Sequence, residues 1–459
     1  MRGKTLLEDA VVENSAALDS SFRDFQRLRG WHGTRFTQPM ATTTVIIGSG
    51  LAGHLLADRL TQRVAGVQRV VLIGEENQGG YDRRLLPDAL VGTPVPSSDA
   101  RWYSTRGIEA VLGDAVATVD RARRVVRTAN GRNLTYDRLV FATGALPWLP
   151  DLPGRDLPGV LTLRTPDDAA VARSVLRGKR RVTIIGGGPI GVTAAHRLAC
   201  AGHTVELVEV ASSWCLRHLD RTTADAVDRC LAAAGVTRFA GRQALGITRS
   251  ESTLSVRLSG GLDSPSDLVL VVAGVRPRDE IAAACGLRRS FDGGIRVDER
   301  MVTDDPRVLA LGECARFGGH LMGGAEAIHR AVPVVIASLL EEEGRFEDPG
   351  ADVALDFGGI GCWSFGEVHG SEIDQALRWQ QGEERRTVVL RGTHLVGACG
   401  FGHWHEVATV AAAVSRKLRL WPWQIERFRR QGSLWVDSRD ERPTTDAFRP
   451  LPTPRPALA

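Results

Sequence analysis

The feature that most constrains the fold of this chain is a local pattern that occurs twice. Each copy reads as an apolar strand, a glycine-rich turn, a helix and a second strand that ends in an acid, and the copies begin near residues 43 and 181. This order of elements is typical of the βαβ unit of a dinucleotide-binding Rossmann sheet. Its repetition predicts an α/β chain with two Rossmann-like dinucleotide-binding domains.

The first turn has the pattern GxGxxG, formed by Gly48, Gly50 and Gly53, with Leu51 and Ala52 before the third glycine. The first glycine permits a tight turn, the second lets the backbone approach a pyrophosphate, and the third lets the helix pack closely on the strand. The positive N-terminal end of the helix stabilises the phosphate charge. We therefore expect these five residues to bind a dinucleotide.

Two adjacent acids, Glu75 and Glu76, end the strand that follows the first turn. A carboxylate in this position can accept hydrogen bonds from the ribose hydroxyls of a dinucleotide. The alignment of the motif that follows, at 81–86, favours Glu76 over Glu75 in this role.

The second turn repeats the arrangement with Gly186, Gly188 and Gly191, and Pro189 and Ile190 lie between the last two glycines. The same physical argument predicts that these five residues hold the pyrophosphate of a second dinucleotide.

The acid that ends the strand after the second turn is Glu209. A carboxylate there accepts hydrogen bonds from a ribose diol and repels a 2′-phosphate, so it favours NADH over NADPH. Arg217, a few residues further on, would weaken that preference.

Further segments resemble one known family. They are "YDRRLL" at 81–86, "ATG" at 142–144, "GVRPRDEIAAACGL" from residue 274 and "LGECA" at 311–315. With the two turns, they are similar to the pyridine nucleotide-disulfide oxidoreductase superfamily, and within it to ferredoxin reductases and the FAD/NADH part of the nitrite reductase large subunit. The resemblance is specific for fold and cofactor, whereas it does not name a substrate.

The resemblance implies that FAD binds at the first turn and NADH at the second. It adds a group of cofactor-binding residues outside the turns, and it implies that the carboxylate of Glu313 accepts a hydrogen bond from the flavin's ribityl chain. The added residues are Arg83, Ala142, Thr143, Gly144, Gly274, Gly312 and Glu313.

The same resemblance gives a domain organisation in which the NAD module is inserted into the FAD module and an α+β domain follows. The predicted parts are an N-terminal extension (1–40), an FAD-binding domain (41–158 and 286–345), an NAD(P)-binding domain (159–285), a C-terminal interface domain (346–437) and a tail (438–459).

Two positions depart from the family pattern. Ferredoxin-reductase-like members have a lysine where this chain has Asp88, and many members have a glutamate where it has Thr193. We therefore expect the family's Lys–Glu ion pair near the flavin to be missing on both sides. The segment 79–93 contains no cysteine, so a dithiol relay is not expected.

Composition narrows the function classes further. The net charge is +4 in 459 residues, which does not favour nucleic-acid binding, and no apolar run is long enough to span a bilayer. The seven cysteines include no CxxC pair, which favours reduced thiols in a cytoplasmic protein over a disulfide framework and gives no metal site. We expect no nucleic-acid or membrane partner.

In the predicted C-terminal domain, residues 386–402 have the pattern of a β-hairpin, and residues 405–420 and 422–435 are each expected to contain a helix. Tryptophans concentrate in the same domain, where they could form ordinary core, a docking face or a substrate wall. They are Trp363, Trp379, Trp404, Trp421, Trp423 and Trp435.

The function that these features favour is that of an FAD-dependent NAD(P)H oxidoreductase. Electrons would pass from NADH through flavin to a redox partner protein or a small-molecule electron acceptor. One alternative is a flavin oxidase or dehydrogenase of a small amine or amino-acid-derived substrate. Another is a non-catalytic flavin-binding subunit or redox sensor. No catalytic residue is assigned, and pairing of two copies as a homodimer stays open.

Overall fold

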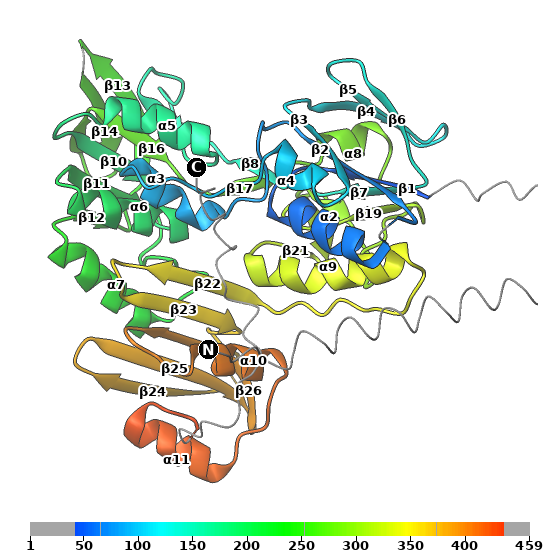
Figure 1. Cartoon of the computed structure of the whole chain (residues 1–459). Helices are drawn as coiled ribbons and strands as arrows, with labels where there is room; N and C mark the ends of the chain where they lie inside the picture. The colour runs from blue at the N-terminus through cyan, green and yellow to red at the C-terminus, as the bar shows by residue number, and fades with distance from the viewer. Residues whose placement is uncertain (1–41, 65, 252, 373, 436–459) are drawn as a thin grey trace, which may run out of the picture. The chain divides into compact units, whose positions relative to one another are not determined.

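The computed structural model describes residues 42–435 except residues 65, 252 and 373 (Figure 1). The predicted N-terminal extension (1–40) and the predicted tail (438–459) lie outside the described residues. No helix within the described ranges has both the length and the apolar character that crossing a membrane requires.

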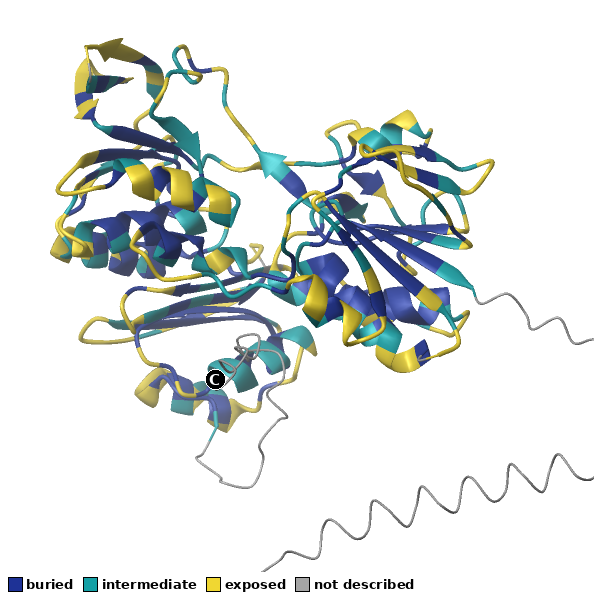
Figure 2. Cartoon of the chain, turned by 45° about the horizontal axis from the view of Figure 1, so that its top comes forward, coloured by how far each residue is buried: buried dark blue, intermediate teal, exposed yellow. Residues whose placement is uncertain are grey.

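The first glycine turn belongs to a parallel sheet of five strands in the order β19-β7-β1-β2-β3. Apart from the edge strand β3, its strands are largely apolar and buried (Figure 2), as expected for a parallel sheet covered by helices. Helix α2 (Leu51–Val64) follows the turn and packs against α9 (Ala325–Leu339). The strands are β1 (Thr43–Ile47), β2 (Arg69–Gly74), β3 (Ile108–Leu112), β7 (Arg138–Phe141) and β19 (Val308–Ala310).

The second glycine turn belongs to a second parallel sheet of five strands, in the order β12-β11-β10-β16-β9. Its helices are α5 (Pro166–Val175), α6 (Pro189–Cys200) and α7 (Arg221–Ala233). Its strands are β9 (Val160–Thr162), β10 (Arg181–Ile185), β11 (Thr204–Glu209), β12 (Thr237–Ala240) and β16 (Leu268–Val271).

The internal repeat extends well beyond the glycine turns. In each sheet, the strand before the turn lies between the strand that follows the helix and a later strand. Each sheet also has an antiparallel three-stranded insertion before that later strand. The insertions are β4 (Val116–Asp120), β5 (Val125–Thr128) and β6 (Asn133–Thr135), and then β13 (Ala244–Ser250), β14 (Thr253–Leu258) and β15 (Leu262–Ser266).

A third sheet is antiparallel, in the order β22-β23-β26-β25-β24, and includes the predicted hairpin of β25 and β26. Helices α10 (Val407–Ser415) and α11 (Pro422–Gln431), both predicted from the sequence, pack on this sheet, and α7 of the second sheet contacts β25 and β26 (Figure 1). The strands are β22 (Ala351–Asp356), β23 (Gly361–Gly366), β24 (Gln375–Gln381), β25 (Glu384–Arg391) and β26 (His394–Phe401).

Short elements complete the chain. The strands β8 (Ala145–Pro147) and β17 (Val275–Pro277) pair antiparallel where the chain leaves the first sheet and returns to it. The remaining elements are η1 (Arg83–Leu85), α3 (Leu86–Leu90), α4 (Ala100–Ser104), α8 (Glu280–Ala284), β18 (Ile295–Arg296), β20 (Ala315–Phe317) and β21 (His320–Leu321). The predicted fold class, two Rossmann-like sheets with an α+β C-terminal part, is confirmed; the predicted domain boundaries stay a prediction.

Candidate functional site: two dinucleotide turns

The two glycine turns share the same backbone geometry at their first glycine. Gly48 has φ +114° and Gly186 has φ +118°. A Cβ at Gly48 would lie 2.1 Å from the carbonyl oxygen of Ala142, and one at Gly186 would lie 2.5 Å from that of Val272. Both positions therefore require glycine, because a side chain would be strained by its dihedral and would collide with a neighbouring strand end.

The third glycine of each turn lets the helix approach its own strand. A Cβ at Gly53 would lie 1.9 Å from the carbonyl oxygen of Gly48, and one at Gly191 would lie 1.8 Å from that of Gly186. The close helix–strand packing that the motif predicts is thus present twice.

The middle glycines face free space in front of a helix N-terminus. A Cβ at Gly188 would meet no atom within 4 Å, and one at Gly50 would meet only the Arg83 guanidinium, at 3.8 Å. The helices begin directly after them, at Leu51 and at Pro189. Unpaired N–H groups, the positive end of the helix and the absence of side chains fit a phosphate group at each turn.

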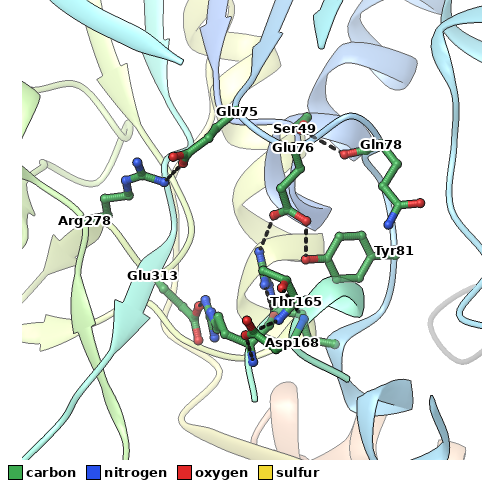
Figure 3. A network of polar contacts seen from close by, with 11 residues as sticks. Ser49, Glu75, Glu76, Gln78, Tyr81, Thr165, Asp168, Arg278 and Glu313 are labelled. Carbon is green, nitrogen blue, oxygen red and sulfur yellow. Dashed lines mark hydrogen bonds and ion pairs between the residues drawn. The ribbon is translucent and has the colours of Figure 1, made fainter. Parts of the chain in front are cut away.

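The two acids of the first sheet have different partners (Figure 3). Glu76 accepts a hydrogen bond from the Tyr81 hydroxyl at 2.8 Å, and its other oxygen lies 3.6 Å from the Arg83 guanidinium. Glu75 is exposed and pairs with Arg278 instead. Tyr81 is 1% exposed, and burial raises the pKa of its hydroxyl above the ordinary range. A protonated tyrosine therefore fixes the carboxylate of Glu76, in keeping with its predicted role.

An arginine that the sequence did not single out, Arg164, lies among the predicted residues. Its guanidinium pairs with the carboxylate of Glu313, and the two side chains are only 14% and 25% exposed. The Arg83 guanidinium donates to the backbone carbonyl of Arg164, and burial, followed by repulsion from Arg164, lowers the pKa of Arg83. No local motif distinguishes Arg164, because Glu313 is 149 residues away in the sequence.

Arg278 is a second such arginine, and it ties the "ATG" segment to the chain that returns from the second sheet. The Thr143 hydroxyl donates to the Arg278 carbonyl at 2.5 Å, and the Arg278 N–H donates to the Gly144 carbonyl at 3.0 Å. A Cβ at Gly144 would lie 3.8 Å from the Arg164 guanidinium. The two missed arginines therefore flank the predicted Thr143–Gly144 segment.

The other predicted residues sit on the same elements. Ala142 follows β7, and a Cβ at Gly312 would lie 3.1 Å from the Cβ of Ala52 in α2. Gly274 lies between β16 and β17, and its carbonyl accepts a hydrogen bond from Trp148 N–H at 2.9 Å.

The acid of the second sheet is held by the backbone. The carboxylate of Glu209 accepts hydrogen bonds from the N–H groups of Gly187 at 2.6 Å and Ala211 at 2.8 Å. Trp214 is 2% exposed, and a Cβ at Gly187 would lie 2.6 Å from its ring. Arg217 is exposed. The carboxylate is thus fixed beside the turn with lone pairs left for further donors.

Asp88 and Thr193 form no counterpart of the family's Lys–Glu pair with each other, but Asp88 has an ionic partner of its own. The carboxylate of Asp88 accepts a hydrogen bond from Arg197 Nε at 2.5 Å. Arg197 lies one helical turn beyond Thr193 on α6, so its longer side chain reaches α3 from there. The Thr193 hydroxyl donates to the carbonyl of Pro189 at 2.8 Å, within its own helix.

The cysteines divide by burial. Cys215, Cys314, Cys362 and Cys399 are buried, whereas Cys200, at the end of α6, is exposed. Burial raises the pKa of the Cys215 and Cys399 thiols to about 12. Across the described ranges, no three His, Cys, Asp or Glu side chains form a group that could hold a metal ion.

The tryptophans of the third sheet also divide. Trp404 is 4% exposed, and the Arg386 guanidinium lies between its ring (5.7 Å) and that of Trp379 (4.5 Å). Trp421 and Trp423, at the start of α11, are 55% and 53% exposed. The prediction that these tryptophans form ordinary core is therefore confirmed for Trp404 and wrong for Trp421 and Trp423.

Comparison with known proteins agrees with this geometry. The family model described as pyridine nucleotide-disulphide oxidoreductase matches residues 42–333. The nitrite reductase [NAD(P)H] large subunit of Klebsiella oxytoca is 31% identical over 375 residues, which are 80% of this chain and 39% of that protein. The ferredoxin–NAD(+) reductase subunit of the benzene 1,2-dioxygenase system of Pseudomonas putida is 32% identical over 289 residues, which are 62% of this chain and 70% of that protein.

Among solved structures, the ferredoxin reductase for the CYP199A2 system of Rhodopseudomonas palustris superposes with a TM-score of 0.75 at 27% identity, covering 83% of this chain and 96% of that chain. The chain belongs to the pyridine nucleotide-disulphide oxidoreductase family. Membership implies FAD and NAD(P)H as cofactors. The chain spans 39% of the length of the nitrite reductase large subunit that it matches, so the activity of that whole protein does not transfer with the family.

Proposed function

We propose that this chain is an FAD-dependent reductase that takes electrons from NADH and passes them to a redox partner protein. The observation that carries the proposal is the pair of dinucleotide turns, each of which leaves free space in front of a helix N-terminus. Two such turns in one chain suit a resident cofactor and an exchanging one.

The first turn is proposed to hold FAD. The backbone around Gly50 and the N-terminus of α2 would bind the pyrophosphate, and the guanidiniums of Arg83 and Arg164 supply positive charge beside it. Glu76, oriented by Tyr81, would accept hydrogen bonds from the adenosine ribose. Glu313 would do so from the ribityl hydroxyls, as the family resemblance implies.

The second turn is proposed to hold NADH. Glu209 is fixed by two backbone N–H groups, so its carboxylate can accept hydrogen bonds from a 2′-hydroxyl and would repel a 2′-phosphate. The exposed Arg217 is a nearby cation that would weaken this preference. The binding energy of the nucleotide would orient its nicotinamide ring for transfer.

When bound, FAD accepts a hydride from a nicotinamide and releases its electrons singly, which suits a one-electron carrier as the acceptor. The protein supplies the orientation of both cofactors and the exclusion of water. The Pseudomonas putida relative is named for ferredoxin as its partner. We propose an acceptor of the same one-electron kind for this chain.

Anaerobic stopped-flow reduction of the purified yellow protein by NADH and by NADPH tests the proposal. Rapid bleaching of the flavin band by NADH, and at least about tenfold slower bleaching by NADPH at equal concentration, is expected. A [2Fe–2S] ferredoxin and ferricyanide are then offered to the reduced protein as protein and small-molecule acceptors. No bleaching by either nucleotide would overturn the proposal and favour a substrate-oxidising flavoenzyme or a flavin-binding subunit.

A further inference from the structure

We propose that Arg197 is a positioning residue that clamps the nucleotide helix α6 between α3 and the turn after β22, and thereby sets the geometry of hydride transfer. The proposal rests on the proposed function for its kinetic consequence. The clamp itself rests on contacts among three elements that are far apart in the sequence.

The guanidinium of Arg197 bridges two carboxylates. Its Nε lies 2.5 Å from Asp88 Oδ1 in α3, and its Nη2 lies 2.6 Å from Asp356 Oδ1 at the end of β22. The Arg197 side chain is 18% exposed, that of Asp88 is 25% exposed and that of Asp356 is 53% exposed. Solvent therefore screens the Asp88 arm of the bridge less than the Asp356 arm.

Asp356 passes the constraint on to a glycine turn. Its carboxylate accepts hydrogen bonds from Gly358 N–H at 3.2 Å and from Gly359 N–H at 2.9 Å. The ring of the neighbouring Phe357 packs edge-on against His196 of α6, with centroids 5.4 Å apart. The turn is therefore held to α6 by a polar contact and an apolar one.

One apolar cluster surrounds the clamp and contains residues of all three elements. Leu90 of α3, Leu198 of α6 and Leu355 of β22 belong to it, and all are buried. The buried apolar surface of this cluster stabilises the contact among the three elements, but it does not fix their relative orientation, because apolar contacts are not directional. Arg197 supplies the direction, because its planar guanidinium presents N–H donors at fixed angles, with one donor bonded to each carboxylate.

The position of Arg197 on α6 links the clamp to the nucleotide. Arg197 is the one Asp, Glu, Lys or Arg in the sequence of α6, and the N-terminus of that helix, at Pro189, faces the proposed pyrophosphate site. The hydroxyl of Thr193 is used within the helix. A rigid helix transmits a displacement at Arg197 to Pro189, and a shift of about 1 Å in a reacting group can cost about 100-fold in rate.

The Asp88–Arg197 pair also takes the place of the family's Lys–Glu ion pair, so α3 and α6 remain joined by an ion pair. The signs are reversed, since the acid is on α3 and the base is on α6, and the base lies one turn further along the helix. A charged partner on each side avoids an unpaired charge in a partly buried position.

Three variants and one matched control test the proposal in the FAD-loaded protein. The variants are Arg197→Ala, Arg197→Lys and Asp356→Asn. The control is Arg229→Ala, which removes an ion pair of 3.0 Å to Glu383 that also joins the second sheet's helices to the third sheet, at side chains 46% and 69% exposed. Each protein is measured for FAD content, for hydrogen exchange in peptides covering 86–90 and 356–361, and for anaerobic reduction by NADH.

We expect Arg197→Ala to speed exchange at Gly358 and Gly359 about tenfold or more, because Asp356 loses its anchor. Its limiting rate of flavin reduction should fall about 10- to 100-fold, with FAD content and half-saturating NADH within about threefold of wild type. Arg197→Lys should lie between, since one ammonium cannot bridge both carboxylates in the same geometry. Arg229→Ala should match wild type in every readout.

If the amide hydrogens of Gly358 and Gly359 exchange in Arg197→Ala at the wild-type rate, the proposed clamp is overturned. Faster exchange with an unchanged limiting rate would overturn the positioning role. If Arg197→Ala does not fold, Arg197→Lys and Asp356→Asn give the same decision. A wild-type protein that NADH does not reduce would instead overturn the proposed function, while the exchange measurement would still decide whether the clamp exists.

Discussion

The two Rossmann sheets have the same strand order and the same glycine turn, but the surroundings of the two turns differ. Around the first turn, arginines from three separate segments meet acids: Arg83 with Glu76, Arg164 with Glu313, and Arg278 with Glu75. Around the second turn, Glu209 is held by neighbouring backbone N–H groups. One fold thus carries one site assembled from distant segments and one site assembled from the ends of two adjacent strands, β10 and β11.

We propose that this difference lets a repeated fold hold two nucleotides for different lengths of time. Side chains that reach in from several segments must all separate before a ligand leaves, which slows dissociation. At the second turn, the contacts of the acid are with backbone N–H groups only, so no side chain has to separate from it. We therefore read the first turn as the place of the resident flavin and the second as the place of the exchanging nucleotide.

The strongest test of the comparison changes the third glycine of each turn. Gly53→Ala and Gly191→Ala each place a Cβ within 2 Å of a carbonyl oxygen, so the turn must move. Gly53→Ala should leave a protein without FAD, whereas Gly191→Ala should keep FAD and raise half-saturating NADH by about 100-fold or more. The FAD-to-protein absorbance ratio after gel filtration and the NADH dependence of reduction measure this.

Gly323→Ala is the control for this pair, because a Cβ there meets no atom within 4 Å and the glycine lacks a positive φ. Loss of FAD from Gly191→Ala would show that the two turns do not act independently.

The next test concerns His54, which follows Gly53, whereas apolar Val192 follows Gly191. His54 is 3% exposed, and burial lowers the pKa of its ring to about 4 from 6.5. The folded state keeps the ring neutral and the unfolded state protonates it, so stability is lost as pH falls from 6.5 toward 4, by about 3 kcal/mol in all.

Urea unfolding of wild type and His54→Asn at pH 7.5, 5.5 and 4.5 measures this loss. Asparagine can still accept a hydrogen bond from Tyr103, which lies 3.0 Å from His54 Nδ1. The variant should therefore lose less stability over this range. Parallel pH curves for the two proteins would contradict the prediction.

A smaller effect is expected from neutralising the acid of each turn. Glu76→Gln should weaken FAD binding about tenfold, because Arg83 and Tyr81 lose a charged acceptor. Glu209→Gln should weaken NADH binding about tenfold and leave FAD unchanged, since one amide oxygen replaces two acceptors for Gly187 and Ala211. Equilibrium titrations of each variant with FAD and with NADH measure these affinities. Weaker NADH binding in Glu76→Gln with unchanged FAD binding, or weaker FAD binding in Glu209→Gln with unchanged NADH binding, would contradict the assignment of the turns.

The smallest effect is expected at Arg278, whose side chain is 34% exposed and pairs with Glu75 at 54%. An exposed pair contributes little, so Arg278→Ala should change FAD affinity by less than about threefold. Arg164→Ala, whose partner Glu313 is 25% exposed, should have the larger effect. Equal effects of the two variants would show that the burial of these pairs does not decide their contribution.

Local features of the molecule were predictable from sequence, whereas contacts between distant segments were not. Both glycine turns, the strand-end acids and the hairpin of β25 and β26 follow from residues within about 30 positions of one another. Arg164, Arg278 and Arg197 were missed because their partners are 149, 203 and 109 residues away. Their roles depend on how the sheets pack, which no short motif encodes.

Asp88 is another residue whose contact could not be predicted from a motif. The family pattern marked it as a departure, and the sequence suggested a lost ion pair. The structure gives Asp88 a new partner at a position that the pattern does not include. A residue's departure from a motif therefore predicts a changed contact more securely than an absent one.

The division of the cysteines gives the protein a built-in labelling site. Cys200 is exposed, Cys230 and Cys285 are half-buried, and Cys215, Cys314, Cys362 and Cys399 are buried. Burial raises the pKa of all six of the less exposed thiols, which lowers their reactivity. A maleimide dye added briefly at neutral pH should thus attach first to Cys200. Because Cys200 is the last residue of α6, that dye would report movements of this helix without an engineered cysteine.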